Sequence, residues 1–188
     1  MKTVIRKFGS LFLMIGFFLI SINSYSQNIK PTREEQKEAM KAAKLENFNV
    51  LDSLLNAKSF VLEANFLEDK YGNRIPVSPI VNFIRVNSKE GVLQTGSNWW
   101  TGYNGVGGVT AEGTIGKWKI IKNFKDLSYT IQFTIFTNIG IYDVFMTVNS
   151  DNRAWASITG LRPGKLIYDG YLETNYNSRV YKAQQLYY

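Results

Sequence analysis

The strongest constraint on the fold is a period-two pattern of apolar and polar residues in the second half of the chain. Residues 127–137 alternate between the two kinds, and residues 141–148 repeat the pattern after a short turn. Because successive side chains of a β-strand face opposite sides, this alternation predicts antiparallel strands with one buried face. In the first run the apolar positions are Tyr129, Ile131, Phe133 and Ile135.

Further runs of this kind predict a sheet of about eight strands. The connectors between them are short and rich in turn residues, so neighbouring strands are expected to pair as hairpins. An open sheet of this size exposes two edges, which closure into a barrel removes. We therefore expect an all-β protein with one N-terminal helix, folded as an antiparallel up-and-down β-barrel of about eight strands, with a lumen that is either packed or holds one small ligand. The predicted strands are residues 60–66, 79–86, 92–95, 114–121, 127–137, 141–148, 153–159 and 165–173.

The N-terminus has the order of features found in a secretory signal peptide. Lys2, Arg6 and Lys7 form a basic head, residues 11–20 are almost wholly apolar, and a small-x-small pattern ends at Ser26. The apolar run is short for a membrane span, which needs about 20 residues. We predict cleavage after Ser26, and the alternative is an uncleaved N-terminal anchor.

Export determines the predicted organisation and location of the chain. The chain is predicted to divide into a signal peptide (residues 1–26), an N-terminal helical segment (27–57) and a β-barrel domain (58–188). Cleavage removes three basic residues and lowers the formal net charge from +7 to +4, a modest value that does not indicate nucleic-acid binding. The new N-terminus is Gln27 rather than cysteine, and no later segment is apolar enough to span a membrane. We expect a periplasmic or extracellular protein that is not a lipoprotein.

A helix is predicted soon after the cleavage site, over residues 34–57. Thr32 and Glu35 have the spacing of a capping box, and Asn47 and Asn49 are points where the helix is expected to be interrupted. One apolar face is expected to pack on the barrel, and the alternative is that it binds a partner. The residues of that face are Met40, Phe48, Leu51 and Leu55. At the other end of the chain, residues 175–188 are expected to pack on the barrel or to add an edge strand.

The absence of histidine and cysteine removes most catalytic chemistry. Ser-His-Asp and Cys-His catalysis are excluded, and zinc, haem and iron–sulfur sites lose their usual ligands. No catalytic motif, metal site or cofactor is predicted. The carboxylates of Glu112, Asp143 and Asp169 lie in or near predicted strands, and a glycoside hydrolase would need two carboxyl groups facing one cleft.

The most unusual segment is residues 98–113, which combines three large aromatic residues with five glycines. It lacks the Gly-Lys-Ser/Thr ending of a phosphate-binding loop, and a strand follows it where such a loop precedes a helix. We predict that four of its glycines are structural, because they permit bulges and a bend as the sheet coils: Gly105, Gly107, Gly108 and Gly113. We predict that its aromatic residues bind a ligand, and the alternative is that they close one end of the barrel: Trp99, Trp100 and Tyr103.

Three short sequence patterns carry a resemblance to a known family. They are VxPxxNFI at residues 77–84, NGxGGxTxxG at residues 104–113 and YxG at residues 168–170. With them the chain, over about residues 58–173, resembles an uncharacterised domain-of-unknown-function family of exported Bacteroidetes proteins. The resemblance implies a periplasmic or surface location and a lipocalin-like β-barrel. It implies no established activity and supplies no functional residues.

The leading hypothesis is a non-catalytic barrel that binds a small apolar molecule or a glycan fragment at a mouth lined by the three aromatic residues. It rests on the expected closed sheet, the aromatic loop and the missing catalytic residue types. The alternative is a structural or partner-binding component of a cell-envelope complex. No nucleic-acid partner is expected.

Overall fold

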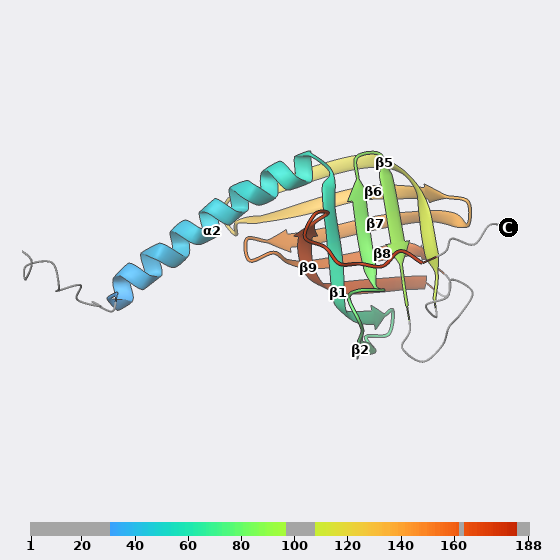
Figure 1. Ribbon diagram of the computed structural model, residues 1–188, viewed down its shortest axis with the longest axis horizontal. Coiled ribbons are helices and arrows are strands. Elements are labelled where there is room, and N and C mark those ends of the chain that lie inside the picture. The colour runs from blue at the N-terminus through green and yellow to red at the C-terminus, as the bar shows by residue number, and fades with distance from the viewer. Residues whose placement is uncertain (1–30, 97–107, 162–163, 184–188) are drawn as a thin grey trace, which may run out of the picture. The chain divides into compact units, whose positions relative to one another are not determined.

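The computed structural model describes residues 31–96, 108–161 and 164–183. The chain divides into two units between Glu38 and Ala39, and all the strands belong to the second unit. The predicted signal peptide lies outside the described residues and stays a prediction. Figure 1 shows helix α2 followed by the strands of a single sheet.

Helix α2 spans Arg33–Asn56 and begins at the predicted capping box. The amide of Thr32 donates to the Glu35 carboxylate at 2.7 Å, and the amide of Glu35 donates to the Thr32 hydroxyl at 3.3 Å. The helix runs through Asn47 and Asn49 without a break, so the expected interruption is wrong. Three of the four predicted apolar residues are buried, namely Phe48, Leu51 and Leu55, whereas Met40 is 67% exposed.

Asn47 does not interrupt the helix because its side chain helps to dock the helix. Its amide nitrogen donates to the Ser150 carbonyl at 2.6 Å and to Asn152 Oδ1 at 2.8 Å, both in the turn after β7. Phe48 stacks on the Tyr129 ring, and the Tyr129 hydroxyl donates to the Phe48 carbonyl at 3.0 Å. The last turns of α2 are therefore attached to the barrel.

The sheet closes into the predicted barrel. Its strands lie in the order β2-β1-β3-β4-β5-β6-β7-β8-β9, and β1 also pairs with β9, so eight antiparallel strands form a ring while β2 adds to the far half of β1. This confirms the predicted fold. The strands are β1 Ser59–Asp69, β2 Arg74–Pro76, β3 Phe83–Asn87, β4 Glu90–Gln94, β5 Thr110–Asn123, β6 Ser128–Thr137, β7 Gly140–Asn149, β8 Arg153–Leu161 and β9 Gly164–Thr174.

The strand predicted over residues 79–86 is wrong in its first half. Residues 79–82 form a turn, in which Asn82 donates to the Ser78 carbonyl at 2.9 Å and accepts from the Gly96 amide at 2.8 Å. These side-chain bonds replace the pairing that a strand would supply. Strand β5 also begins at Thr110, inside the glycine-rich segment and earlier than predicted.

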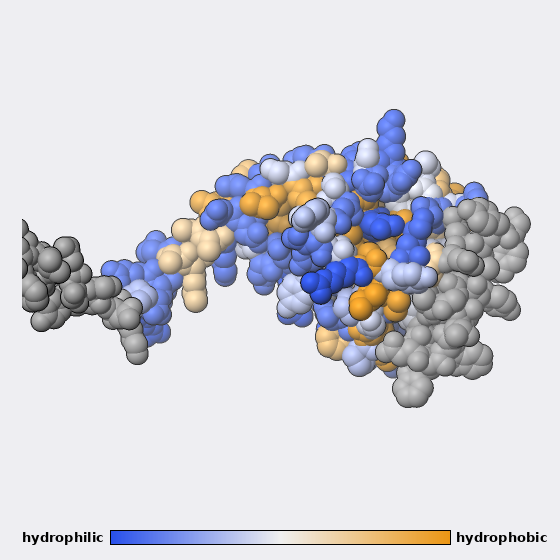
Figure 2. Space-filling model, viewed as in Figure 1, coloured by the Kyte–Doolittle hydropathy of each residue, from blue (hydrophilic) through white to orange (hydrophobic). Residues whose placement is uncertain are grey.

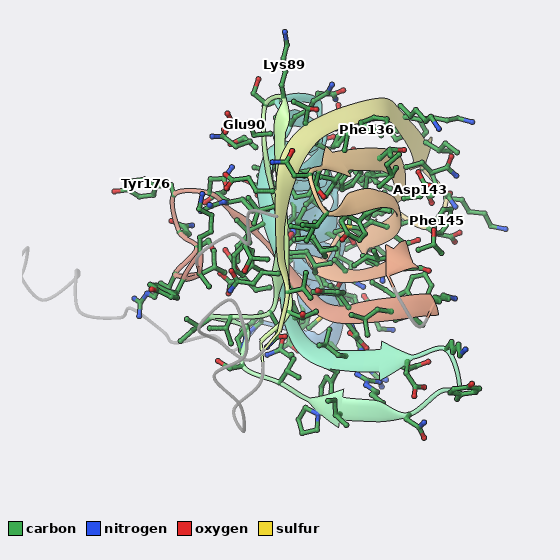
Figure 3. All side chains as sticks on the ribbon, turned by 90° about the vertical axis from the view of Figure 1, so that its right-hand side faces the viewer. Lys89, Glu90, Phe136, Asp143, Phe145 and Tyr176 are labelled. Carbon is green, nitrogen blue, oxygen red and sulfur yellow. The ribbon has the colours of Figure 1, made fainter. Side chains whose placement is uncertain are left out.

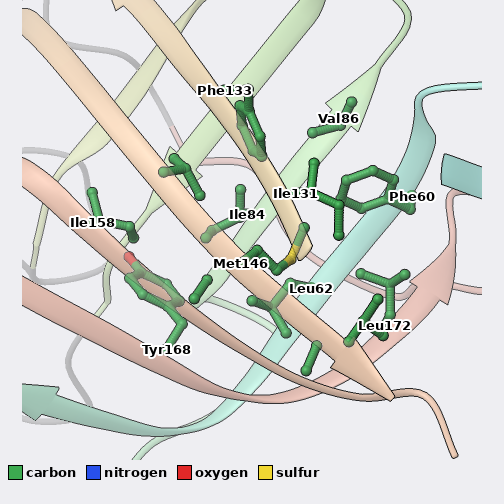
Figure 4. Close-up of a cluster of buried hydrophobic side chains, with 14 of the residues drawn as sticks. Phe60, Leu62, Ile84, Val86, Ile131, Phe133, Met146, Ile158, Tyr168 and Leu172 are labelled. Carbon is green, nitrogen blue, oxygen red and sulfur yellow. The ribbon is translucent and has the colours of Figure 1, made fainter. Parts of the chain in front are cut away.

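Apolar side chains from all eight barrel strands fill the interior. Figure 4 shows part of this core, with the side chains of Phe60, Met146 and Tyr168 close together. Phe60, Ile84, Met146 and Ile158 have 0% exposure. A side chain without accessible surface adjoins no space large enough for a water molecule, so the lumen around these residues is packed. Tyr168 is also fully buried, and its hydroxyl donates to the Gln94 carbonyl at 3.0 Å. Burial raises the pKa of Tyr168 well above its ordinary value.

Residues 175–183, here called the strap, cross the outer face of β1, β3 and β4 (Figure 1, dark red). Val180 packs on an outward-facing apolar cluster. Its members are Val61, Phe83 and Val92. The Tyr181 amide donates to the Ile80 carbonyl at 2.8 Å. Up to residue 183, the strap therefore confirms the expectation that the C-terminal segment packs on the barrel, while residues 184–188 lie outside the described residues. On this face polar residues surround separate apolar patches (Figure 2).

Gln94 fastens the strap to the barrel with its whole side chain, which is 0% exposed. Its amide nitrogen donates to the carbonyls of Tyr181, at 2.9 Å, and Val81, at 3.2 Å. Its amide oxygen accepts from the Ala183 amide at 2.9 Å and from the Thr110 hydroxyl at 3.1 Å. Every hydrogen-bonding position of this buried amide is thus used within the chain.

Candidate binding site on the open face of the barrel

The aromatic residues predicted to bind a ligand, Trp99, Trp100 and Tyr103, lie outside the described residues. Gly105 and Gly107 lie there as well. Their roles stay predictions, and the candidate site is built from the part of the chain that the structure describes.

Gly108 and Gly113 stand where neighbouring backbone approaches closely. A Cβ atom at Gly108 would overlap the Thr95 carbonyl, and one at Gly113 would overlap the Phe136 carbonyl. Both contacts are with backbone, which cannot swing aside as a side chain does. These two positions therefore need a residue without a Cβ atom, because neighbouring backbone leaves no space for one.

The three strand carboxylates lie apart on the outer surface. Glu112 forms an ion pair with the Lys182 ammonium at 2.8 Å. Asp169 forms ion pairs with the guanidinium groups of Arg74 at 2.6 Å and Arg153 at 3.6 Å. Asp143 lies in a separate pocket. Among the described residues, no group of three or more carboxylates forms a candidate metal site.

One outer pocket, of about 270 Å³, lies beside the strap. It is lined by Arg85, Asn87, Glu90, Val92, Glu112 and Asn175. Glu112 is ion-paired to the strap through Lys182, and Asn175 is bonded to Ser59 and to the Val86 carbonyl. Much of its polar lining therefore serves to hold the strap.

A second pocket, of about 300 Å³, forms beside an irregularity in β5. Gly116 pairs with Thr134 and Lys119 pairs with Gln132, so Lys117 and Trp118 together stand opposite Phe133. This is a β-bulge, a feature that redirects side chains and is common beside functional sites. Trp118 packs against Phe133, with ring centroids 5.1 Å apart, while Lys117 is exposed and lines the pocket.

Lys117 adopts φ +51°, in the left-handed region. That conformation is unfavourable for residues with a Cβ atom and costs on the order of 1 kcal/mol or more. The bulge is therefore a strained feature, and its result is to place an ammonium group at the edge of the pocket.

Two cross-strand rows of outward-facing residues form most of the rest of the pocket, together with Phe133 and Val144. One row runs from Gln132 on β6 through Phe145 on β7 to Ser157 on β8, and the other runs from Thr134 through Asp143 to Thr159. We call this surface of β6, β7 and β8 the open face. Figure 3 shows Asp143 and Phe145 on the side of the barrel opposite Glu90 and Tyr176.

The polar groups of the open face are mostly unused within the described part of the chain. The Thr134 hydroxyl donates to Asp143 Oδ1 at 2.6 Å, which holds the carboxylate in place and leaves its other oxygen without a described partner. The side chains of Gln132, Ser157 and Thr159 have no hydrogen bond to any described residue. Phe145 is 42% exposed among them. The pocket thus presents an aromatic ring, hydrogen-bond donors and acceptors, one carboxylate and one ammonium.

Sequence reasoning missed this pocket because its polar residues match an ordinary solvated face. One signal was present: the inward residues of β5 are at odd positions up to Ile115 and at even positions from Trp118. Such a change of phase marks a bulge.

Comparisons with known proteins give a family and a fold. The family model described as "Domain of unknown function (DUF4251)" matches residues 42–172. The chain is similar to a DUF4251 family protein from Bacteroides eggerthii DSM 20697, known from a crystal structure at 1.95 Å resolution. The two share 30% sequence identity with a TM-score of 0.60, over 73% of this chain and 93% of the other.

No curated protein matches the chain. Within the described residues, no helix combines the length and the apolar character needed to cross a membrane. The family model covers more than half of the chain, and the solved relative has the same family assignment. The chain therefore belongs to the DUF4251 family, whose domain has no established function.

Proposed function

We propose that the protein is exported and binds a fragment of a glycan, without cleaving it, in the pocket of the open face. The observation that carries the proposal is the set of donors and acceptors around the exposed ring of Phe145 that bond to no described residue. Export is supported by the basic head, apolar run and small-x-small exit of the N-terminus.

The chemistry of the pocket suits a sugar. A sugar ring has hydroxyl groups that both donate and accept hydrogen bonds, and C–H faces that pack against an aromatic ring. Gln132, Ser157 and Thr159 offer both kinds of hydrogen-bonding group, and Asp143 offers a fixed acceptor beside Phe145. A volume of about 300 Å³ is at the lower end of small-molecule sites, which favours a fragment over a long chain.

The interior of the barrel supports a site on the outer surface, because its described core residues leave no space for a ligand. Phe60, Ile84 and Met146 have no accessible surface, so an apolar ligand would have to displace them. Removing packed core side chains from their places is costly. The outer pocket, in contrast, is already formed.

Binding without cleavage follows from the groups that line the pocket. Glycoside hydrolysis by the usual route takes two carboxyl groups separated by about 5–10 Å. Asp143 is the one carboxylate among the described residues that line the pocket. The whole sequence has no histidine or cysteine to replace the second group.

The test is a binding screen of the chain that begins at Gln27 against a panel of oligosaccharides, followed by calorimetric titration of each hit. Phe145→Ala and Asp143→Asn are expected to weaken binding by about tenfold or more, because each removes a group that contacts the sugar. The matched control is Tyr171→Ala, which removes a similarly exposed ring from β9, outside the pocket. It is expected to leave affinity unchanged.

Two results would contradict the proposal. One is the absence of binding to every saccharide in the panel. The other is binding that survives Phe145→Ala but is lost when Trp99 and Trp100 are both changed to alanine, which would place the site at the mouth predicted from the sequence. Recovery of a stoichiometric protein partner, with no saccharide bound, would instead favour a component of a cell-envelope complex.

A further inference from the structure

We infer that the bound saccharide is acidic, a sugar of the uronic acid type whose carboxylate pairs with Lys117. The inference rests on the proposed function, because it names the class of glycan that the same pocket takes. It is carried by the position and conformation of Lys117, and by the absence of an ion pair between this lysine and any described residue.

Lys117 is held at the pocket by a backbone arrangement that works against ordinary strand structure. The bulge interrupts the pairing of β5 with β6, and the residue adopts φ +51°. A regular strand would place the side chain by simple alternation and without strain. Strained positions of this kind concentrate at binding and catalytic sites, where the surrounding structure maintains them.

The ammonium group of Lys117 has no ion pair within the described residues, unlike several other cations of the barrel. Lys122 pairs with Asp52 at 3.2 Å, and Lys182 pairs with Glu112 at 2.8 Å. Asp143 lines the same pocket as Lys117, yet its described bond is with Thr134. The pocket therefore presents, on the β5 side, one cation that forms no ion pair with a described residue.

The two charges of the pocket determine the orientation of the bound ligand. A ligand carboxylate is attracted to Lys117 and repelled by Asp143, so it belongs on the β5 side. The sugar hydroxyls then face Asp143 and the two hydroxyl residues of β8. A single lysine, without an arginine to form paired hydrogen bonds, suits an anion of one charge better than a doubly charged phosphate.

The test compares acidic oligosaccharides with neutral partners of the same linkage. Trigalacturonate and its methyl ester form one pair, and triglucuronate with cellotriose forms another. Calorimetric titration is expected to show at least one acid binding about tenfold more tightly than its neutral partner. That preference is expected to shrink as salt is raised, because the pair is exposed and screened. Sulfated galactose oligomers form a third arm, and their binding in place of every uronate would overturn the assignment to a carboxylate.

Lys117→Gln is expected to remove the preference for the acid, so that the acid and its neutral partner bind about equally. Lys117→Arg is expected to retain the preference. Lys125→Gln is the control, since it makes the same change in net charge in the exposed turn between β5 and β6. Lys117→Gly, which accommodates the left-handed conformation, gives a second folded variant without the charge.

The possible failures are distinguishable. Equal binding of acids and neutral partners, with loss of both in Phe145→Ala, would overturn the acidic class while leaving the proposed function intact. A preference for acids that persists in Lys117→Gln would overturn the role of this lysine. The absence of binding to any saccharide would overturn the proposed function itself.

Discussion

The barrel has two contrasting outer faces, one crossed by the strap and one formed by β6, β7 and β8. On the first, the side-chain amide of Gln94 makes four hydrogen bonds within the chain, and Glu112 is paired with Lys182. On the second, the side chain of Gln132 has no described hydrogen bond, and Lys117 has no described ion pair. Both faces are built from the same outward positions of antiparallel strands. The difference, in the described part of the chain, is that the strap covers the first face.

The contrast separates structural from functional polar groups. A polar group that folding buries must find a partner, because leaving it unpaired costs about 1–3 kcal/mol. The covered face meets most of this requirement with the strap, and Asn175 Oδ1 is the one buried polar side-chain atom among the described residues without a partner. On the open face Asp143 and Thr159 are exposed and Gln132 and Ser157 are partly exposed, so these polar groups remain available to a ligand at little cost to folding.

The largest expected effect in this comparison comes from removing the part of the strap beyond Asn177. A chain that ends at Asn177 lacks the hydrogen bonds of Tyr181 and Ala183, the Lys182 ion pair and the cover of Val180. With about 1 kcal/mol per hydrogen bond and more for re-exposed apolar surface, the free energy of unfolding is expected to fall by about 4 kcal/mol. Urea denaturation measures it. A loss below about 1 kcal/mol would mean that the strap is not structural.

A pair of identical substitutions compares the two faces directly. Gln94→Ala leaves several buried partners unsatisfied and is expected to cost about 3 kcal/mol of folding stability. Gln132→Ala is expected to change stability by less than about 0.5 kcal/mol, because its amide bonds to no described residue. Denaturant titration of both variants decides the matter, and equal effects would remove the distinction between the faces.

Tyr168 links the interior to the covered face, because its ring is buried in the core and its hydroxyl donates to the Gln94 carbonyl. Substitution of Tyr168 tests this link. The pKa of Tyr168 is raised by burial, so the folded state keeps the proton more firmly than the unfolded state does. Its contribution is therefore complete below the unfolded pKa of about 10 and is lost as pH rises above that value. Tyr168→Phe is expected to cost about 1 kcal/mol at neutral pH and to reduce the alkaline loss of stability, as measured by denaturation from pH 8 to pH 11. An unchanged alkaline slope would contradict this account.

The smallest expected effect concerns strain on the edge of the open-face pocket. Lys117→Gly removes the left-handed strain but adds the entropy cost of glycine, so stability is expected to rise by about 0.5 kcal/mol. Lys119→Gly, two residues along the same strand, is expected to lower stability by about 1 kcal/mol. Thermal denaturation of the two variants is the measurement. Destabilisation by both would show that the bulge is not strained.

Local patterns predicted the fold well because they act over few residues. The period-two alternation of β6 and β7 specified strands with one dry face, and the Thr32–Glu35 spacing specified the start of α2. Closure followed from the cost of open sheet edges. Each of these requirements is visible within a short window of sequence.

Features that depend on distant contacts were not predictable in the same way. Gln94 holds the strap through Tyr181 and Ala183, which lie 87 and 89 positions later in the chain. Nothing near Gln94 in the sequence indicates these contacts. Met40 shares a helical face with Phe48, yet the barrel contacts only the later part of that face among the residues described. The open-face pocket combines four consecutive strands, and its residues become one site only when these strands pair in register.

The most direct test of the central claim is a titration of ¹⁵N-labelled protein with the saccharide that binds most tightly, followed by amide chemical shifts. The account predicts that the largest changes fall on Lys117 and on the lining residues of β6, β7 and β8, with little change in the strap. Changes concentrated in the core residues of the barrel, or in the strap, would show that the ligand binds elsewhere and would contradict the assignment of the open face.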